Sequence, residues 1–307
     1  MTDAELQVEP GRPEAIRAVP VRHPGRWVSA VVVAVVVAML LHFLLTNKAL
    51  HWNVVGKYLF DSTILKGLER TLILTVIAML MGITIGVILA VMRLSKNPIV
   101  SGFAWLYIWF FRGTPVLVQL LFWYNLPAVL HSVSLGIPFG PSWFASSPTT
   151  VITQFVAACL GLGLNEAAYM AEIARAGLLS VDEGQREASE ALGMSAMQTM
   201  RRIVLPQAMR VIVPPTGNET ISMLKTTSLV SVIGYAELLY TAQIIYARNY
   251  ETIALLITVS LWYLFLTSVL TIGQYYVERY YARGAMRNLP PTPIQRVRRR
   301  LGIGEAL

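Results

Sequence analysis

The feature that most constrains this chain is a set of long apolar runs without a single Asp, Glu, Lys or Arg. Three such runs are residues 27–46, 71–92 and 252–276. Inside a bilayer every backbone amide and carbonyl must be hydrogen-bonded within the segment, so a helix needs about 20 apolar residues to cross. Each run reaches that length. The chain is therefore predicted to be an integral membrane protein.

Three further apolar runs are interrupted by charged residues. Residues 99–130 contain Arg112, 149–174 contain Glu166 and Glu172, and 209–234 contain Glu219 and Lys225. Together with the first three, they predict an all-α, polytopic membrane protein with about six transmembrane helices. The first run is longer than the ~7–15 apolar residues of a signal peptide, so an uncleaved anchor is favoured over a cleaved leader.

Basic residues predict the orientation of these spans. If the N-terminus is cytoplasmic, the internal segments hold 17 of the 25 lysines and arginines and the external ones hold 5. Because positive residues concentrate on the cytoplasmic side, both termini are expected inside. Topology thus accounts for the net charge of +8, and no nucleic-acid partner is expected. The run 296–300 is read as part of a solvated tail, with anionic lipid as the alternative.

The expected organisation follows from these spans. Residues 1–26 form a cytoplasmic N-terminal segment, and 27–60 an extra transmembrane helix with an external linker. Residues 61–282 form the main transmembrane domain, and 283–307 a basic cytoplasmic tail.

Metal and nucleotide sites are not expected in this chain. Cys159 is the only cysteine and the four histidines lack ligand spacing, so neither a disulfide nor a metal site is predicted. The sequence has no G-x-x-x-x-G-K-[ST] loop. ATP, if it is used, must bind to another subunit.

The loop between the fourth and fifth spans has the pattern of two short helices joined at a glycine. It begins Glu187-Ala188-Ser189, reaches Gly193, and ends at Pro206. Ser195 and Gln198 form a capping-box pattern that would start the second helix. Such a hairpin can dock on a partner protein, although a connector resting on lipid headgroups would show the same pattern.

These residues resemble the EAA signature of ABC-importer permeases, with Ser189 where alanine is usual. The resemblance implies that the loop at 187–206 couples to two cytoplasmic ATPase subunits, and that Glu187, Ala188, Gly193 and Pro206 are the coupling positions. It further implies a five-helix permease core behind the extra N-terminal helix.

The resemblance extends over about residues 60–282, through the segments 111–119, 165–172, 184–185, 205–208, 218–219 and 225–231. These look like the branch that imports polar amino acids such as histidine, glutamine, glutamate, arginine, cystine or opines. Such a permease implies an external binding protein, a second permease copy or similar chain, a bacterial cytoplasmic membrane, and no cofactor or catalytic residue of its own.

Charged groups inside spans are expensive and tend to face a polar pathway. In the third span, Gly113 and Pro115 interrupt the helix, and Pro115 frees the carbonyl of Phe111. Broken helices often form transport sites. Polar side chains near this break and on single helical faces of the fourth and fifth spans are therefore predicted to line a substrate pathway. They are Arg112, Thr114, Gln119, Asn165, Tyr169, Glu172, Asn218, Lys225 and Ser228.

Structural roles for these residues remain open at this point. Arg112 could pair internally with a glutamate, Glu172 could pair with Arg175, and the polar stripe of the fifth span could bond to another helix. Two other functions also remain: an ion-coupled secondary amino-acid transporter using the intramembrane glutamates, and a membrane scaffold that recruits cytoplasmic partners. A membrane enzyme is disfavoured because no nucleophile elbow, metal motif or catalytic dyad is present.

Overall fold

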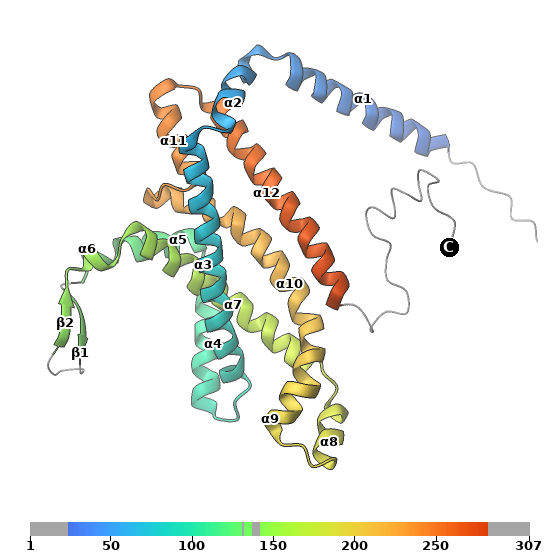
Figure 1. The fold of residues 1–307 in the computed structure, drawn as a ribbon, viewed down its shortest axis with the longest axis vertical. Helices are drawn as coiled ribbons and strands as arrows, with labels where there is room; N and C mark the ends of the chain where they lie inside the picture. Colours follow the sequence, from blue (N-terminus) through green and yellow to red (C-terminus); the bar gives the residue numbers. More distant parts are fainter. Residues whose placement is uncertain (1–23, 131, 137–141, 282–307) are drawn as a thin grey trace, which may run out of the picture. The chain divides into compact units, whose positions relative to one another are not determined.

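The computed structural model describes residues 24–130, 132–136 and 142–281 and divides into two units, Met1–Leu50 and His51–Leu307 (Figure 1). In the first unit, helix α1 spans Pro24–Thr46 and a short 3-10 turn, η1, spans Lys48–Leu50. Most of the expected N-terminal segment and the whole basic tail at 283–307 lie outside the described residues.

The second unit is mostly helical, which confirms the predicted all-α membrane fold. Its helices and turns are α2 (Trp52–Leu59), α3 (Ser62–Arg93), α4 (Pro98–Gly113), α5 (Val116–Asn125), η2 (Leu126–Ala128), α6 (Pro148–Val151), α7 (Gln154–Leu179), α8 (Glu183–Ala191), α9 (Ala196–Thr199), η3 (Met200–Val204), α10 (Leu205–Thr226), η4 (Thr227–Ile233), α11 (Leu238–Asn249) and α12 (Thr252–Tyr281). An antiparallel pair, β1 (Val133–Gly136) and β2 (Ser142–Ser146), was not expected and lies in the predicted external loop.

Within the described residues, three helices are long and apolar enough to cross a membrane: α3, α12 and, in the first unit, α1. Two bent pairs raise the count to five: α4 with the segment 116–128 at 102°, and the segment 196–233 with α11 at 46°. The remaining predicted span, the fourth along the chain, is α7, which has 26 residues. Its polar side chains make it too polar to be among the spans identified by length and apolarity.

The core of the second unit forms where α7 packs against α3, the most extensive helix contact in the chain. Alanines of α7 are fully buried there, and Gly82 and Gly86 of α3 leave no room for a β-carbon against it. Small residues let helix backbones approach closely in membranes, where van der Waals packing drives association. α7 is thus held at the centre of the bundle, with α4, α5 and α10 also packed on it.

Glu237 ties together the predicted external ends of α3, α11 and α12. Its carboxylate is fully buried and accepts hydrogen bonds from the amides of Leu239 and Tyr240 and from the Tyr263 hydroxyl, at 2.8 to 3.1 Å. Thr71 of α3 accepts from the Leu238 amide at 3.1 Å. The first turn of α11 is therefore capped by a side chain that also anchors α12.

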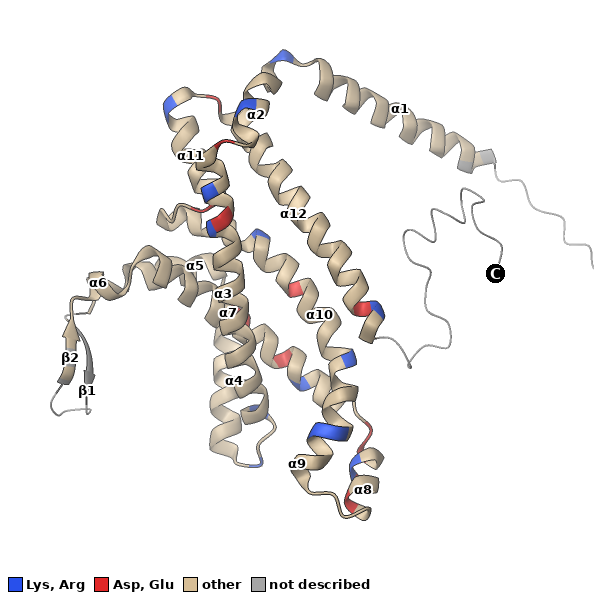
Figure 2. Cartoon of the chain, viewed as in Figure 1, with Lys and Arg blue, Asp and Glu red and all other residues tan. Residues whose placement is uncertain are grey.

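The expected external linker is partly structured. Its residues 52–59 form α2, which packs on α12, and the Trp262 indole donates to the Leu59 carbonyl at 2.8 Å. Figure 2 shows most lysines and arginines of the second unit near helix ends, and carboxylates part-way along α7 and α10. Those carboxylates lie at the functional site.

Candidate functional site

The third predicted span is broken, as the sequence indicated. α4 ends at Gly113, α5 begins at Val116, and the chain between them turns by 102° at Thr114 and Pro115. The carbonyl of Phe111 does not stay free: Gln119 Nε2 donates to it at 3.0 Å and Asn165 Nδ2 at 2.8 Å.

Gln119 and Asn165, both predicted to line the pathway, therefore hold the break in place. Gln119 also donates to the carbonyl and hydroxyl oxygens of Thr114, at 3.1 and 2.7 Å. Its side chain is buried, and its Oε1 has no hydrogen-bond partner. Thr114 in turn donates to the Phe110 carbonyl at 2.9 Å. The break is thus a rigid corner fixed by side chains.

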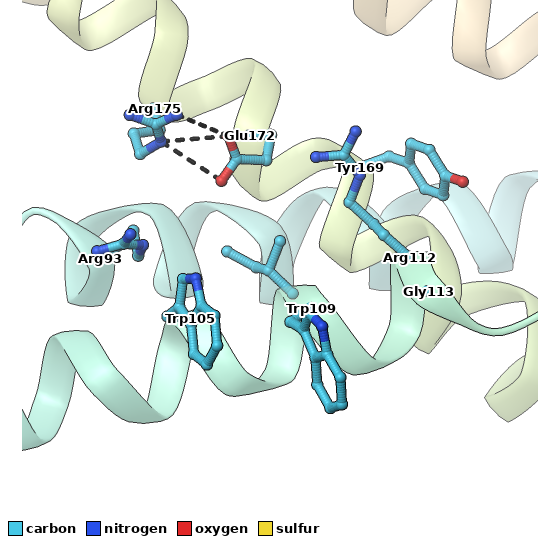
Figure 3. A pocket seen from close by; sticks show the side chains of 9 residues that line it. Arg93, Trp105, Trp109, Arg112, Gly113, Tyr169, Glu172 and Arg175 are labelled. Carbon is cyan, nitrogen blue, oxygen red and sulfur yellow. Dashed lines mark hydrogen bonds and ion pairs between the residues drawn. The ribbon is translucent and has the colours of Figure 1, made fainter.

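A cavity of about 530 Å³, the arginine cavity, lies between α4 and α7, next to the last residue of α3. It is lined by Arg93, Trp105, Ile108, Trp109, Arg112, Gly113, Tyr169, Glu172 and Arg175 (Figure 3). The guanidinium of Arg112 lies 5.2 Å from the centre of the Tyr169 ring, a cation–π distance. Trp105 and Trp109 stack with their ring centres 6.2 Å apart.

Glu172 forms the ion pair that the sequence left open as an alternative. Arg175 Nη2 lies 2.7 Å from its Oε2, one turn along the same helix. Arg112 has no glutamate partner among the ion pairs of the described residues. The arginine cavity thus keeps more positive than negative charge on its walls.

A second cavity of about 280 Å³, the carboxylate cavity, lies between α5, α7 and α10. It is lined by Val116, Leu162, Asn165, Glu166, Tyr169, Glu219, Ser222, Met223 and Thr226. Tyr169 is common to both cavities, so Asn165, Tyr169 and Glu172 follow one helix face from one cavity to the other. Glu166 is buried, with only 4% of its surface exposed. Its Oε1 has no hydrogen-bond partner.

Three of the pathway residues predicted on the fifth span lie away from the two cavities. Asn218, Lys225 and Ser228 line neither of these two cavities, and Ser228 donates to the Lys225 carbonyl at 2.7 Å. The residues of α10 that face the carboxylate cavity are Glu219, Ser222, Met223 and Thr226. The helical spacing 219, 222, 226 was visible in the sequence, but a second stripe with the same period competed with it.

The loop at 187–206 forms a protruding hairpin (Figure 1). α8 ends at Ala191, Gly193 adopts a left-handed φ of 73°, and Ser195 and Gln198 make the expected capping box at the start of α9. The second helix is not a separate short element: it continues through the π-helical turn η3 into α10. Pro206 is the second residue of α10 and has no backbone amide to donate to the π-helical turn before it.

The hairpin is stiffened inside and carries exposed apolar side chains at its tip. Ser189 and Thr199 are both buried, and their hydroxyls lie 2.9 Å apart, joining α8 to α9. Glu187 and Ala188 are exposed, and at the tip Leu192 is 82% and Met197 60% exposed. Exposed apolar groups on a rigid hairpin are typical of a docking surface.

The bundle, the broken span and the two cavities define a multi-pass membrane permease. The chain belongs to the family of the inner membrane component of binding-protein-dependent transport systems, which it matches over residues 82–283. Its relatives are permeases of amino-acid transport systems, and it is the permease subunit of an amino-acid ABC importer.

Two relatives and one solved structure illustrate the similarity. The chain is 47% identical to the arginine transport system permease protein of Corynebacterium glutamicum, covering 93% of this chain and 90% of that one. It is 39% identical to the nopaline transport system permease protein of Agrobacterium fabrum, covering 68% and 83%. An amino acid ABC transporter solved with histidines matches 71% of this chain and 94% of its own, with 36% identity and a TM-score of 0.61.

Proposed function

We propose that this chain pairs with a second copy, or with a similar permease, in the bacterial cytoplasmic membrane and moves a polar amino acid inward. An external binding protein delivers the amino acid, and two cytoplasmic ATPase subunits drive the movement. ATP binds only to those subunits, and this chain catalyses no covalent step. The family match and the amino-acid relatives support this assembly.

The hairpin made by α8 and α9 carries the coupling part of the proposal. Its apolar tip is exposed at Leu192 and Met197, whereas its interior is fixed by the bond between Ser189 and Thr199. Because α9 runs without a break through η3 into α10, a push on the tip acts directly on a helix that lines the carboxylate cavity. Movement of an ATPase subunit would thereby reach the substrate.

The substrate route in this proposal follows α7. Tyr169 lines both cavities. On either side of the break in the third span, Arg112 lines the arginine cavity and Val116 lines the carboxylate cavity. The side chains Thr114 and Gln119 hold the corner, while Arg112, Asn165 and Tyr169 face the route.

Reconstitution in lipid vesicles tests the proposal. The permease, the ATPase and the binding protein encoded beside it are incorporated with ATP on the ATPase side, and uptake of labelled amino acids is measured. Uptake should require all three proteins and ATP and should survive an uncoupler. Uptake without the ATPase that collapses with an uncoupler would identify an ion-coupled carrier, and absence of uptake of every amino acid would favour the scaffold.

The orientation is tested separately by cysteine labelling. In a Cys159→Ser background, Glu187→Cys should react with a membrane-impermeant maleimide only after the cells are opened. Glu251→Cys, in the predicted external loop before α12, should react in intact cells. Labelling of residue 187 from outside would end the coupling proposal, since no cytoplasmic ATPase could reach the hairpin.

A further inference from the structure

The carboxylate cavity carries two glutamates and no compensating cation. Glu166 comes from α7 and Glu219 from α10, and both line it. None of its lining residues is a lysine, arginine or histidine, and neither glutamate joins an ion pair within the part of the chain that the structure describes. Glu166 is almost completely buried with one oxygen unbonded. A carboxylate in such a place is unfavourable unless a partner meets it.

Arg112, the nearby arginine of α4, does not supply that partner. Its guanidinium lies over the Tyr169 ring and lines the arginine cavity, not the carboxylate cavity. Lys225 of α10 is exposed and also lies outside the lining. Both glutamates are therefore left to face the space between the helices.

We propose that Glu166 and Glu219 bind the cationic end of a basic amino acid, with a guanidinium or ammonium side chain, as it passes through the permease. This inference rests on the proposed amino-acid import and specifies its substrate class. A second acidic group in the ligand would face like charge, and a neutral side chain would leave both carboxylates without a partner.

The opposite wall of the cavity suits the other end of such a molecule. Val116, which lines the cavity, is the first residue of α5. Backbone amides at a helix N-terminus lack intrahelical acceptors and carry partial positive charge, so they attract carboxylates. A volume of about 280 Å³ is at the small end for ligand pockets and suits one amino acid.

Gly82 of α3 fixes where the Glu166 carboxylate lies. A β-carbon added at Gly82 would come within 2.6 Å of Glu166 Cγ and 2.8 Å of its Cβ. Only glycine lets the two helices approach with Glu166 in this position. Gly86, one turn further on, gives a matched control, because its added β-carbon would meet Met170 Cβ at 2.5 Å and no carboxylate.

The test compares binding of L-arginine and L-citrulline to the purified permease–ATPase complex, without the binding protein. The two ligands have nearly the same shape, but citrulline carries a neutral urea group. Loss of a charge-assisted hydrogen bond corresponds to about 10- to 100-fold in affinity. The wild-type complex should prefer arginine by at least about 10-fold, and Glu219→Gln, at a half-buried position that should tolerate the change, should erase most of that preference.

Glu166→Gln and Gly82→Ala should also lower the preference, whereas Gly86→Ala should keep it even if it weakens binding of both ligands. The ratio of the arginine and citrulline affinities separates a role in recognising the ligand's charge from a merely structural role, because misfolding lowers both affinities together. A wild-type complex that fails to bind arginine or binds citrulline equally well, or a Glu219→Gln complex with an unchanged ratio, would overturn the inference. ATP-driven uptake of another amino acid in those cases would leave the proposed import standing.

Discussion

Replacing Gly193 with valine should uncouple the permease from its ATPase. Gly193 has φ of 73°, and a β-carbon there would have nothing within 4 Å. The variant therefore clashes with no neighbour and acts through backbone strain alone. A left-handed conformation costs an ordinary L-residue about 1–2 kcal/mol, and a β-branched residue is worse. The folded hairpin should become about 5- to 30-fold less populated relative to distorted forms.

The assay is binding of the purified ATPase to the permease in detergent or nanodiscs, followed by uptake in vesicles. ATPase affinity should fall by at most the same factor, about 5- to 30-fold, with uptake falling alongside it. Gly193→Asn is the matched control, because asparagine tolerates the left-handed region, and it should stay close to wild type. Normal ATPase binding and uptake by the valine variant, or equal losses for asparagine and valine, would refute the reasoning.

Three smaller predictions concern other contacts. Ser189→Ala removes the hydroxyl bond to Thr199 and should weaken ATPase binding by about 5-fold, measured in the same assay. Gln119→Leu should lower the melting temperature through a loss of about 1–3 kcal/mol, while Val118→Ala at an exposed position should change it little. Asp61→Ala should reduce stability by about 0.5–2 kcal/mol at pH 7, since Asp61 caps α3 through the Thr63 amide. That amide lowers the pKa of Asp61 below its ordinary value of 3.8, so the stabilisation is present above that value and is lost as the pH falls through the lower folded pKa; melting curves of wild type and variant should converge in acid.

The sequence predicted the membrane helices well because length and apolarity act locally. The unbroken runs became α1, α3 and α12, and the glycine, proline and capping residues predicted the break after Gly113 and the turn at Gly193. Chain geometry at these points depends on one or two residues, so neighbouring letters suffice. The β1–β2 pair and α2 escaped prediction because short elements carry little periodic signal.

The cavity-facing residues were harder to predict for a physical reason. A span with several polar residues has more than one stripe at helical spacing, and only the neighbouring helices select the stripe that faces the cavity. On α10 they selected Glu219, Ser222 and Thr226 in place of Asn218 and Lys225. Similarly, Asn165 donates to the Phe111 carbonyl from 54 residues further along the chain, a contact that spacing alone does not reveal.

By itself the sequence determined the class of protein, since the apolar runs, the basic segments and the hairpin pattern each follow from local composition. Tertiary structure alone decided which charged groups meet. It placed Arg112 over Tyr169 and left Glu166 Oε1 unbonded beside Gly82, whereas Glu172 and Arg175 pair within one helix, as the sequence had allowed. The reason is that charge pairing inside a bundle depends on helix rotation and depth, and these are set by packing across the whole core.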